Sequence, residues 1–263
     1  MADPLILLPP SEGKAAGGTG APWAPGTMAV DLDALREKVL DALVKTARWS
    51  AVRRQKLLGV KGDALAAATA ANASVRTAPT LPAIERYTGV LYDALDVGSL
   101  RSADRKRLER SVLVVSGLWG LVAPSDPVPD YKLKMGATLP GPGKLQSLWS
   151  PACTEALRAR AGSGRGAATV WNLLPNEHDA VWRPPAGFAQ YRVKFLERKA
   201  DGSLVAVAHW NKLLKGALVR WLLAHPGAGP DDLGEWDHPL GYRLDRDRTE
   251  SGPSGTTLVL VQV

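Results

Sequence analysis

The sequence predicts an α/β protein in which a mixed sheet is surrounded by helices. Short apolar runs such as 5–8 and 111–119 are typical of buried strands, and segments with apolar residues at helical spacing separate them. Near the carboxyl end, 191–208 predicts a hairpin with Asp201-Gly202 as its turn. No fixed-period repeat interrupts the chain, so we expect a single domain over residues 1–263.

The first strand, LILL at 5–8, is expected to end at Pro9 and Pro10. A glycine-rich loop follows it. Asp31 is then placed to cap a helix that runs to about Trp49, because apolar residues recur there every three or four positions.

The same two patterns predict the remaining elements in chain order. Polar, glycine-rich segments at 160–168 and 245–255 are expected to be surface loops. Helices are expected at about 51–58, 62–71, 81–95, 102–110, 145–161 and 211–226, and further strands at 111–119, 168–174 and 256–263.

Charge and composition favour an anionic partner. The 263 residues include 33 Lys and Arg against 26 Asp and Glu, which gives a net charge of +7 and suits nucleic acid, a nucleotide or a phosphorylated metabolite. Cys153 is the sole cysteine and the four histidines are dispersed, so we predict no disulfide, no metal site and no cofactor. No run of eighteen apolar residues occurs, and a soluble cytoplasmic protein without a membrane partner is expected.

The segment at about 51–72 resembles a helix-hairpin-helix element. Gly59 and Gly62 would allow a tight turn whose backbone N–H groups, at the start of the second helix, bind a DNA phosphate without reading bases. Basic side chains would add salt-sensitive affinity. They are Arg53, Arg54, Lys56 and Lys61. An ordinary glycine turn between two helices is the alternative.

Two loops that follow predicted strands carry further candidates. The turn PPSEGK brings together Ser11, Glu12 and Lys14, where Lys14 could neutralise a phosphate and Glu12 could act as a base. The stretch SGLWGLVAPSDPVPDYKLKMG places Ser116 and Gly117 at the end of a strand and leads to Tyr131 and Lys134. A solvated turn and a structural loop over the sheet edge remain the alternatives.

Two later segments complete a candidate cleft. NLLPNEHDAVW offers Asn172 and Glu177 at the end of a strand. On the helix at 211–226, Lys212, Gly216 and Arg220 recur every four residues and therefore share one face, whose central gap would let a phosphate come close. Lys215 adds a further cation on this helix, and a solvated helix surface is the alternative.

Taken together, these motifs resemble the YaaA family of bacterial peroxide-stress proteins over nearly the whole chain. SGLWGLVAPSDPVPDYKLKMG is similar to a family pattern SGLYGxLxPxDxxxPYRLEMG, and NLLPNEH is similar to NLAS-x-EY. The resemblance implies a compact mixed α/β fold, a positively charged cleft, DNA binding and a role in limiting oxidative damage by keeping iron low. The positions carried over are Ser11, Lys14, Gly89, Tyr92, Ser116, Gly117, Gly120, Pro124, Tyr131, Met135, Gly136, Asn172, Glu177, Lys194, Lys212, Gly216 and Arg220.

The chain departs from the family pattern inside the expected cleft. Glu12-Gly13 stands where many relatives have Pro-Ala, Trp119 replaces a tyrosine, and Lys132 and Lys134 stand where Arg and Glu are common. Pro175-Asn176 interrupts the usual Asn-Leu-Ala-Ser run. These departures fit a relative that has been adapted to another ligand.

Three functions remain open at this point. A DNA-binding stress protein would use the basic turn and cleft. An enzyme acting on a small anionic or nucleobase-like substrate would bind it through Lys14, Lys194, Lys212 and Arg220. Tyr131 or Trp119 would then stack a ring, and Glu12 or Glu177 would move protons, with Ser11, Ser116 and Tyr131 as further catalytic candidates. A protein that binds iron or a partner without catalysis is the third possibility, although no cluster of His, Glu and Cys ligands is visible in the sequence.

Overall fold

The computed structural model describes residues 3–162, 168–185, 188–207 and 210–263. The strands of its main sheet are β1 (Leu5–Leu8), β3 (Val112–Ser116), β4 (Gly120–Val122), β8 (Val170–Asn172), β9 (Gln190–Arg198), β10 (Leu204–Ala206), β11 (Tyr242–Gly252) and β12 (Gly255–Gln262). Their order across the sheet is β11-β12-β9-β8-β1-β3-β4, and β10 pairs with β9 outside this path. The expected mixed α/β fold is therefore confirmed.

Parallel pairs form the centre of the sheet and antiparallel pairs its edges. β1 pairs in parallel with both β3 and β8, and β9 pairs in parallel with β8 and β12. β4, β10 and β11 each join their neighbour in the antiparallel sense. The hairpin of β9 and β10 turns at Asp201-Gly202, where Gly202 adopts a φ of 83°, as the sequence predicted.

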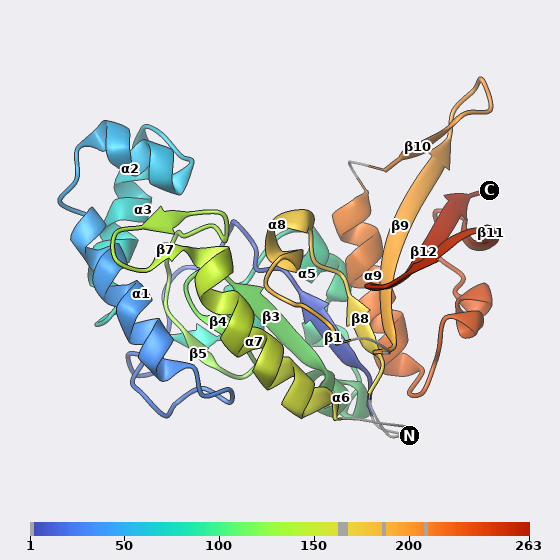
Figure 1. Ribbon diagram of the computed structural model, residues 1–263, viewed down its shortest axis with the longest axis horizontal. Helices are drawn as coiled ribbons and strands as arrows, with labels where there is room; N and C mark the ends of the chain where they lie inside the picture. The colour runs from blue at the N-terminus through green and yellow to red at the C-terminus, as the bar shows by residue number, and fades with distance from the viewer. Residues whose placement is uncertain (1–2, 163–167, 186–187, 208–209) are drawn as a thin grey trace.

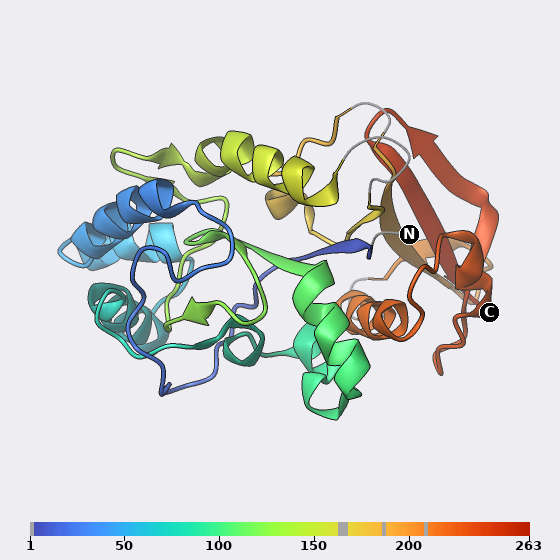
Figure 2. The ribbon, with the colours of Figure 1, turned by 90° about the horizontal axis from the view of Figure 1, so that it is seen from below.

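Helices cover both faces of this sheet (Figures 1 and 2). Helix α7 (Leu145–Ala161) lies on one face, and α5 (Val90–Leu95), α6 (Ser102–Ser111) and α9 (Asn211–Ala224) lie on the other. At the end of the molecule opposite β9 and β12 stand α1 (Asp33–Thr46), α2 (Ala51–Leu58) and α3 (Asp63–Ser74).

Shorter elements connect these layers. A two-stranded ribbon pairs β2 (Leu81–Pro82) with β5 (Pro127–Val128), and a second pairs β6 (Thr138–Leu139) with β7 (Gly143–Lys144). The remaining short elements are α4 (Ala83–Arg86), α8 (Asn176–Asp179) and the 3₁₀ turns Val97–Ser99 and Asp231–Glu235.

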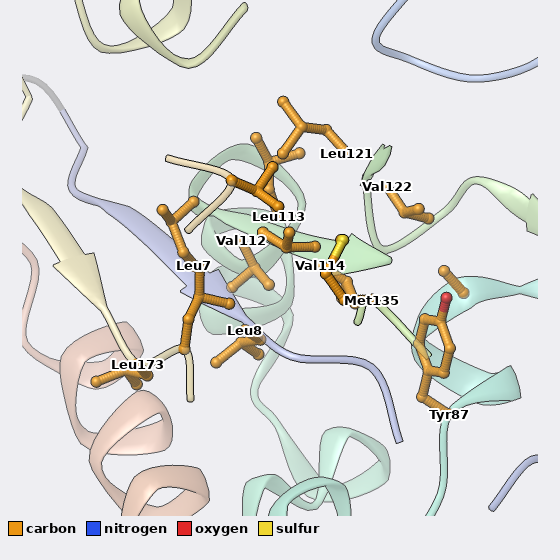
Figure 3. Packing of buried hydrophobic residues seen from close by; sticks show 14 of the residues in the cluster. Leu7, Leu8, Tyr87, Val112, Leu113, Val114, Leu121, Val122, Met135 and Leu173 are labelled. Atoms are coloured by element: carbon orange, nitrogen blue, oxygen red, sulfur yellow. The ribbon is translucent and has the colours of Figure 1, made fainter. Parts of the chain in front are cut away.

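The core is centred on β1 and β3, every residue of which is buried. Parallel strands that are covered on both faces are apolar throughout rather than alternating, and LILL and VLVV follow that rule. Figure 3 shows Leu7 and Leu8 of β1 beside Val112 and Val114 of β3. This rigid centre fixes the loops that leave its carboxyl ends.

Two sequence predictions of structure are wrong in detail. Residues 245–252 belong to β11 rather than to a loop, because they extend the antiparallel pairing with β12 past an irregularity between Asp245 and Glu250. The helix expected at 81–95 is broken into α4 and α5, and Gly89, with a φ of 97°, precedes α5. Asp31 lies one residue before the position that precedes α1, but its carboxylate accepts the N–H of Asp33, the first residue of the helix, at 3.3 Å, as a capping side chain does.

The other boundaries agree within a few residues. The loop expected at 160–168 lies partly outside the described residues, since the structure describes α7 to Ala161 and resumes at residue 168. The number of domains stays a prediction.

Candidate functional site

The strand order creates a switch point at β1. The chain passes from β1 to β3 on one side, and it later returns to β8 on the other side. Loops that leave neighbouring parallel strands in opposite directions open a crevice at the carboxyl ends of those strands, which is where α/β proteins bind ligands. The turn 9–14 follows β1, and α8 follows β8, so both reach this crevice.

A cavity of about 260 Å³ occupies that position. The cavity is lined by the first turn, the end of α2, the loop after β5 and the start of α8. Its walls are formed by Pro10, Ser11, Glu12, Lys14, Leu58, Gly59, Tyr131, Lys132, Leu133, Lys134, Glu177 and His178. Of the residues proposed for catalysis, Ser11, Glu12, Lys14, Tyr131 and Glu177 therefore meet in one place.

Lys14 is held in this cavity by its backbone. It forms an isolated antiparallel bridge with Tyr87, and the N–H of Ala15 donates to the carbonyl of Arg86 at 2.9 Å. Its Nζ lies 4.2 Å from the centre of the Tyr131 ring and donates to the carbonyl of Ser11 at 3.3 Å. Burial lowers the pKa of Lys14 to about 8. A substantial fraction of this amine is therefore neutral at mildly alkaline pH.

A chain of hydroxyl groups forms the floor beneath Lys14. The Oγ of Ser116 lies 2.7 Å from the Tyr131 hydroxyl, which in turn lies 3.0 Å from that of Tyr87. Ser116 Oγ also accepts the N–H groups of Leu118 and Trp119 at 3.2 Å each. Burial raises the pKa of Tyr131 to about 12, so the floor stays protonated.

This floor contradicts the expectation that Tyr131 or Trp119 stacks a ligand ring. Trp119 is wholly buried, and its ring packs edge-on against Tyr131. Tyr131 is only 2% exposed and has the Lys14 ammonium over its face. Trp119 is therefore enclosed by the core, and Lys14 occupies a face of the Tyr131 ring on which a ligand ring would have to stack.

Glu177 and His178 of α8 form another part of the wall. The carboxylate of Glu177 accepts the N–H of Gly136, and the Glu177 carbonyl accepts a hydrogen bond from Gln146 at 2.8 Å. Both ring nitrogens of His178 are buried and have no hydrogen-bond partner among the described residues. Burial lowers the pKa of His178 to about 4, so its imidazole is neutral at pH 7.

The rim carries exposed charges. Lys132 Nζ lies 3.2 Å from the Glu12 carboxylate, and this hydrogen bond, with smaller contributions from Lys212 and Lys14, holds the pKa of Glu12 below its usual value. Glu12 therefore stays ionised and is a weak base. Lys212 is exposed on α9 and contributes charge near the rim without lining the cavity.

The turn between α2 and α3 adjoins the same cavity through Gly59. Gly59 ends α2 in the left-handed region at a φ of 71°, and Gly62 precedes α3 at a φ of 58° and ψ of −140°, which favours glycine. Asn72 of α3 fixes this unit, because its side chain exchanges two 2.8 Å hydrogen bonds with the backbone of Lys132. The helices and glycines agree with the sequence; DNA binding by the turn stays a prediction.

Two further hollows lie along α2. One of about 410 Å³ has Arg53, Lys56 and Lys134 in its walls, and one of about 450 Å³ has Lys56, Gly59 and Lys61. They share Lys134 and Gly59 with the cavity and Lys56 with each other. The Arg53 guanidinium lies 4.0 Å from the Trp49 ring, whereas Arg54 is partly buried.

On α9, the space beside Gly216 that was expected to admit an anion is occupied by α5. A Cβ at Gly216 would lie 2.1 Å from the carbonyl oxygen of Leu91, so this glycine permits close packing of α9 on α5. Arg220 donates to the carbonyls of Leu95 at 3.1 Å and Asp96 at 3.0 Å, where it satisfies the end of α5. The prediction that a phosphate approaches the middle of this face is therefore wrong.

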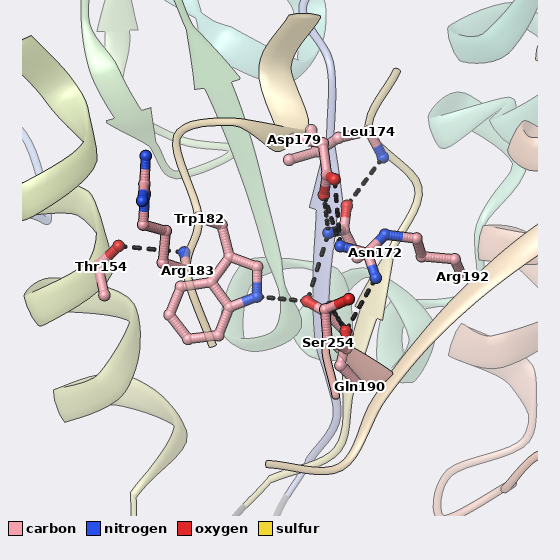
Figure 4. A network of polar contacts seen from close by, with 9 residues as sticks. All are labelled: Thr154, Asn172, Leu174, Asp179, Trp182, Arg183, Gln190, Arg192 and Ser254. Carbon is pink, nitrogen blue, oxygen red and sulfur yellow. Dashed lines mark hydrogen bonds and ion pairs between the residues drawn. The ribbon is translucent and has the colours of Figure 1, made fainter. Parts of the chain in front are cut away.

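Asn172 also lies outside the cavity. Its side chain donates to Asp179 at 2.6 Å and accepts the N–H of Leu174 at 3.1 Å (Figure 4). Gln190 and Arg192 of β9 complete this network. Asn172 therefore shapes the loop that presents α8.

Three further residues that were predicted to bind a ligand do not line the cavity. They are Lys194, Lys215 and Gly117. Lys194 is exposed on β9 and outside the cavity. Lys215 donates to the buried carbonyl of Leu173 at 3.0 Å, and burial lowers the pKa of Lys215 to about 8. At Gly117 a Cβ would come within 2.9 Å of the Lys134 backbone, so this glycine lets the 131–136 loop pass close to β3.

Sequence reasoning missed Asn72, Arg86 and His178. Asn72 follows Leu65 and Ala68 at helical spacing, and that period could have placed it on the buried face. Arg86 is fully buried and donates to the carbonyls of Val128 and Gly17, which are distant in sequence, so no local signal could reveal it. His178 follows Glu177 directly, but only the fold shows that this residue lines the cavity.

Three further observations concern a reactive thiol, a metal site and membrane-spanning helices. Cys153 is wholly buried, and burial raises its pKa to about 12, so it supplies no reactive thiolate. Across residues 3–162, 168–185, 188–207 and 210–263, no three His, Cys, Asp or Glu side chains gather as ligands for a metal ion. In the same part of the chain, the helices are too short or too polar to cross a membrane.

Comparison with known proteins gives a consistent result. A family model described as peroxide stress protein YaaA matches residues 5–248. A UPF0246 protein of Streptomyces coelicolor is 41% identical over 251 residues, which cover 94% of each chain. UPF0246 proteins of Corynebacterium efficiens and Corynebacterium glutamicum are 35% and 34% identical over 84% and 83% of this chain, and these matches cover 86% and 84% of the relatives.

Proposed function

Because the chain belongs to the YaaA family of peroxide stress proteins, we propose that it is a cytoplasmic DNA-binding protein of the peroxide stress response. Phosphates would bind at the α2–α3 turn, and the strand would follow the basic side chains along α2 toward the cavity. These side chains are Arg53, Lys56, Lys61 and Lys134. We define them as the α2 basic strip.

The observation that carries this proposal is the position of the turn at the rim of the cavity. Gly59 belongs to the turn and also lines the cavity, and Asn72 ties α3 to the loop that carries Lys132 and Lys134. A phosphate at the start of α3 would benefit from free N–H groups and the helix dipole. The contact needs no base, so we expect binding with little sequence preference.

The buried Cys153 supports an indirect role in peroxide stress. A thiol with a pKa of about 12 does not react readily with peroxide, because the thiolate is the nucleophile. The contribution of this protein would then come from what it binds. DNA is a principal target of oxidative damage, which is consistent with the proposal.

The test is binding of a fluorescent DNA duplex over a salt series. We expect the affinity to fall steeply with salt, and we expect Lys61→Glu to weaken binding and to reduce the logarithmic salt slope by about 1. Lys106→Glu is the matched control, since Lys106 is also exposed but lies on α6, away from the strip. Equal effects of the two variants would contradict the proposal.

A second candidate is an enzyme of the same fold that acts on a small anionic or nucleobase-like substrate. It is favoured by the enclosed position of Lys14 and by the unpaired His178 ring, which nonspecific phosphate binding does not require. Weak DNA binding that is indifferent to Lys61→Glu would favour this candidate.

A further inference from the structure

Lys14 differs from the cations of the α2 basic strip. Those side chains are exposed, whereas Lys14 is largely buried, lines the cavity and lies over the Tyr131 ring. Its hydrogen-bond acceptor among the described residues is the carbonyl of Ser11, at the long distance of 3.3 Å. A lysine that only bound a phosphate would be expected to stay fully charged and solvated. This one is better placed to react as an amine.

We propose that Lys14 is a nucleophile that forms an imine with an aldehyde on a DNA backbone, namely the ring-opened sugar of an abasic site. This inference rests on the proposed DNA binding, because the α2–α3 turn would hold a phosphate of the same strand at the cavity rim. A volume of about 260 Å³ lies below the usual range for drug-sized ligands and suits a sugar that has lost its base.

The chemistry is a balanced condensation. The neutral Nζ of Lys14 adds to the aldehyde carbon, so that an N–C bond forms and one amine proton passes to the oxygen. The resulting hydroxyl leaves as water with a second proton, which comes from solvent, and a protonated imine remains. No oxidant or reductant is consumed. His178 lines the same cavity, but both of its ring nitrogens are buried, so the proton is taken directly from solvent.

The surroundings of Lys14 support a partly neutral amine. Burial is the main cause of its lowered pKa, and Lys132 and Arg86 lower the pKa further, while Asp130 and Glu12 raise it. The other titratable groups near Lys14 are Tyr87 and Tyr131 beneath it and Lys134, Glu177 and His178 in the walls of the same cavity. Imine formation should therefore become faster as pH rises toward 8.

The test is reductive trapping with the full chain. One fluorescent duplex carries a single abasic aldehyde and a second carries a tetrahydrofuran residue, which has the same shape but no aldehyde. Cyanoborohydride converts an imine into a stable amine that denaturing electrophoresis detects, and peptide mass spectrometry locates it. We expect an adduct with the first duplex only, on Lys14, and we expect its loss in Lys14→Met but not in Lys106→Met.

The outcomes separate this inference from the proposed function. Binding of both duplexes without an adduct overturns the imine and leaves DNA binding intact, whereas binding of neither overturns both. An adduct on another lysine, or trapping of a small aldehyde such as glyceraldehyde but not of the duplex, also overturns the inference. Mapping on the wild-type protein keeps the test decisive if Lys14→Met folds poorly.

Discussion

Lys14 and Lys215 are two partly buried lysines at the same end of the sheet, and they differ in what surrounds the amine. Lys215 is on α9 and donates to the carbonyl of Leu173, directly after β8, at 3.0 Å. Lys14 follows β1, has the 3.3 Å contact to Ser11, and faces the cavity. In both residues burial lowers the pKa to about 8.

The difference teaches that a perturbed pKa does not identify a functional lysine by itself. Structural hydrogen bonds also bury amines, and the shifted pKa is then a consequence of packing. What distinguishes Lys14 is an open volume in front of its amine and an aromatic face behind it. Variants at both positions can break or sharpen this comparison.

The largest expected effect is on stability. Lys215→Met would leave the buried carbonyl of Leu173 without its partner, which should lower the free energy of unfolding by roughly 1–3 kcal/mol. Lys14→Met should cost less, because its acceptor lies on a turn at the cavity wall and relief of a buried charge offsets the lost contact with Tyr131. Urea unfolding of both variants measures the difference. Equal losses would make Lys14 as structural as Lys215.

The next effect concerns pH. Both folded-state pKa values lie near 8, below the ordinary 10.5, so the unfolded state binds more protons between these values and stability rises with pH there. Each Met variant lacks one of these contributions, so the wild type should gain stability relative to either variant, by at most about 1.4 kcal/mol per pH unit for each. The buried tyrosines act equally in all three proteins and cancel in the difference.

Unfolding at pH 8, 9 and 10 measures this gain. A constant difference between wild type and Lys14→Met would mean that the folded Lys14 titrates at its ordinary pKa. The amine would then be almost wholly charged at neutral pH, and the nucleophilic role would lose its electrostatic support.

The sequence predicted the strands and loops that form the site better than the roles of its individual side chains. Apolar runs such as LILL and VLVV predicted β1 and β3, because burial on both faces leaves a continuous apolar pattern. Position after a strand then predicted that Lys14, Tyr131 and Glu177 would meet. These inferences need only local pattern and the rule that parallel strands end at one edge.

The rest depended on contacts between distant segments. The spacing of Lys212, Gly216 and Arg220 correctly gave one helix face, but only packing shows that Gly216 admits α5 and that Arg220 satisfies its last carbonyls. Likewise, Asn172 is polar at the end of a strand because it orders a loop through Asp179. A local sequence pattern cannot distinguish a polar side chain that hydrogen-bonds within the protein from one that is available to bind a ligand.

The smallest expected effect tests whether phosphates approach on the Lys14 side of the molecule. Asp63 is the first residue of α3, where its carboxylate interacts favourably with the helix dipole and would repel an incoming phosphate. Asp63→Asn should therefore strengthen duplex binding at 0.1 M salt by at most about 1 kcal/mol, or roughly fivefold, while slightly destabilising the helix.

The matched control for Asp63→Asn is Asp93→Asn, which removes the same charge from an exposed position in the first turn of α5. If phosphates bind at the α2–α3 turn, only the Asp63 variant should gain affinity, because exposed charges farther away than about 10 Å are screened at 0.1 M salt. Equal gains in the two variants would mean that the duplex responds to net charge alone. The cavity at Lys14 would then have no DNA strand delivered to it, and the comparison with Lys215 would have to be explained by a small ligand.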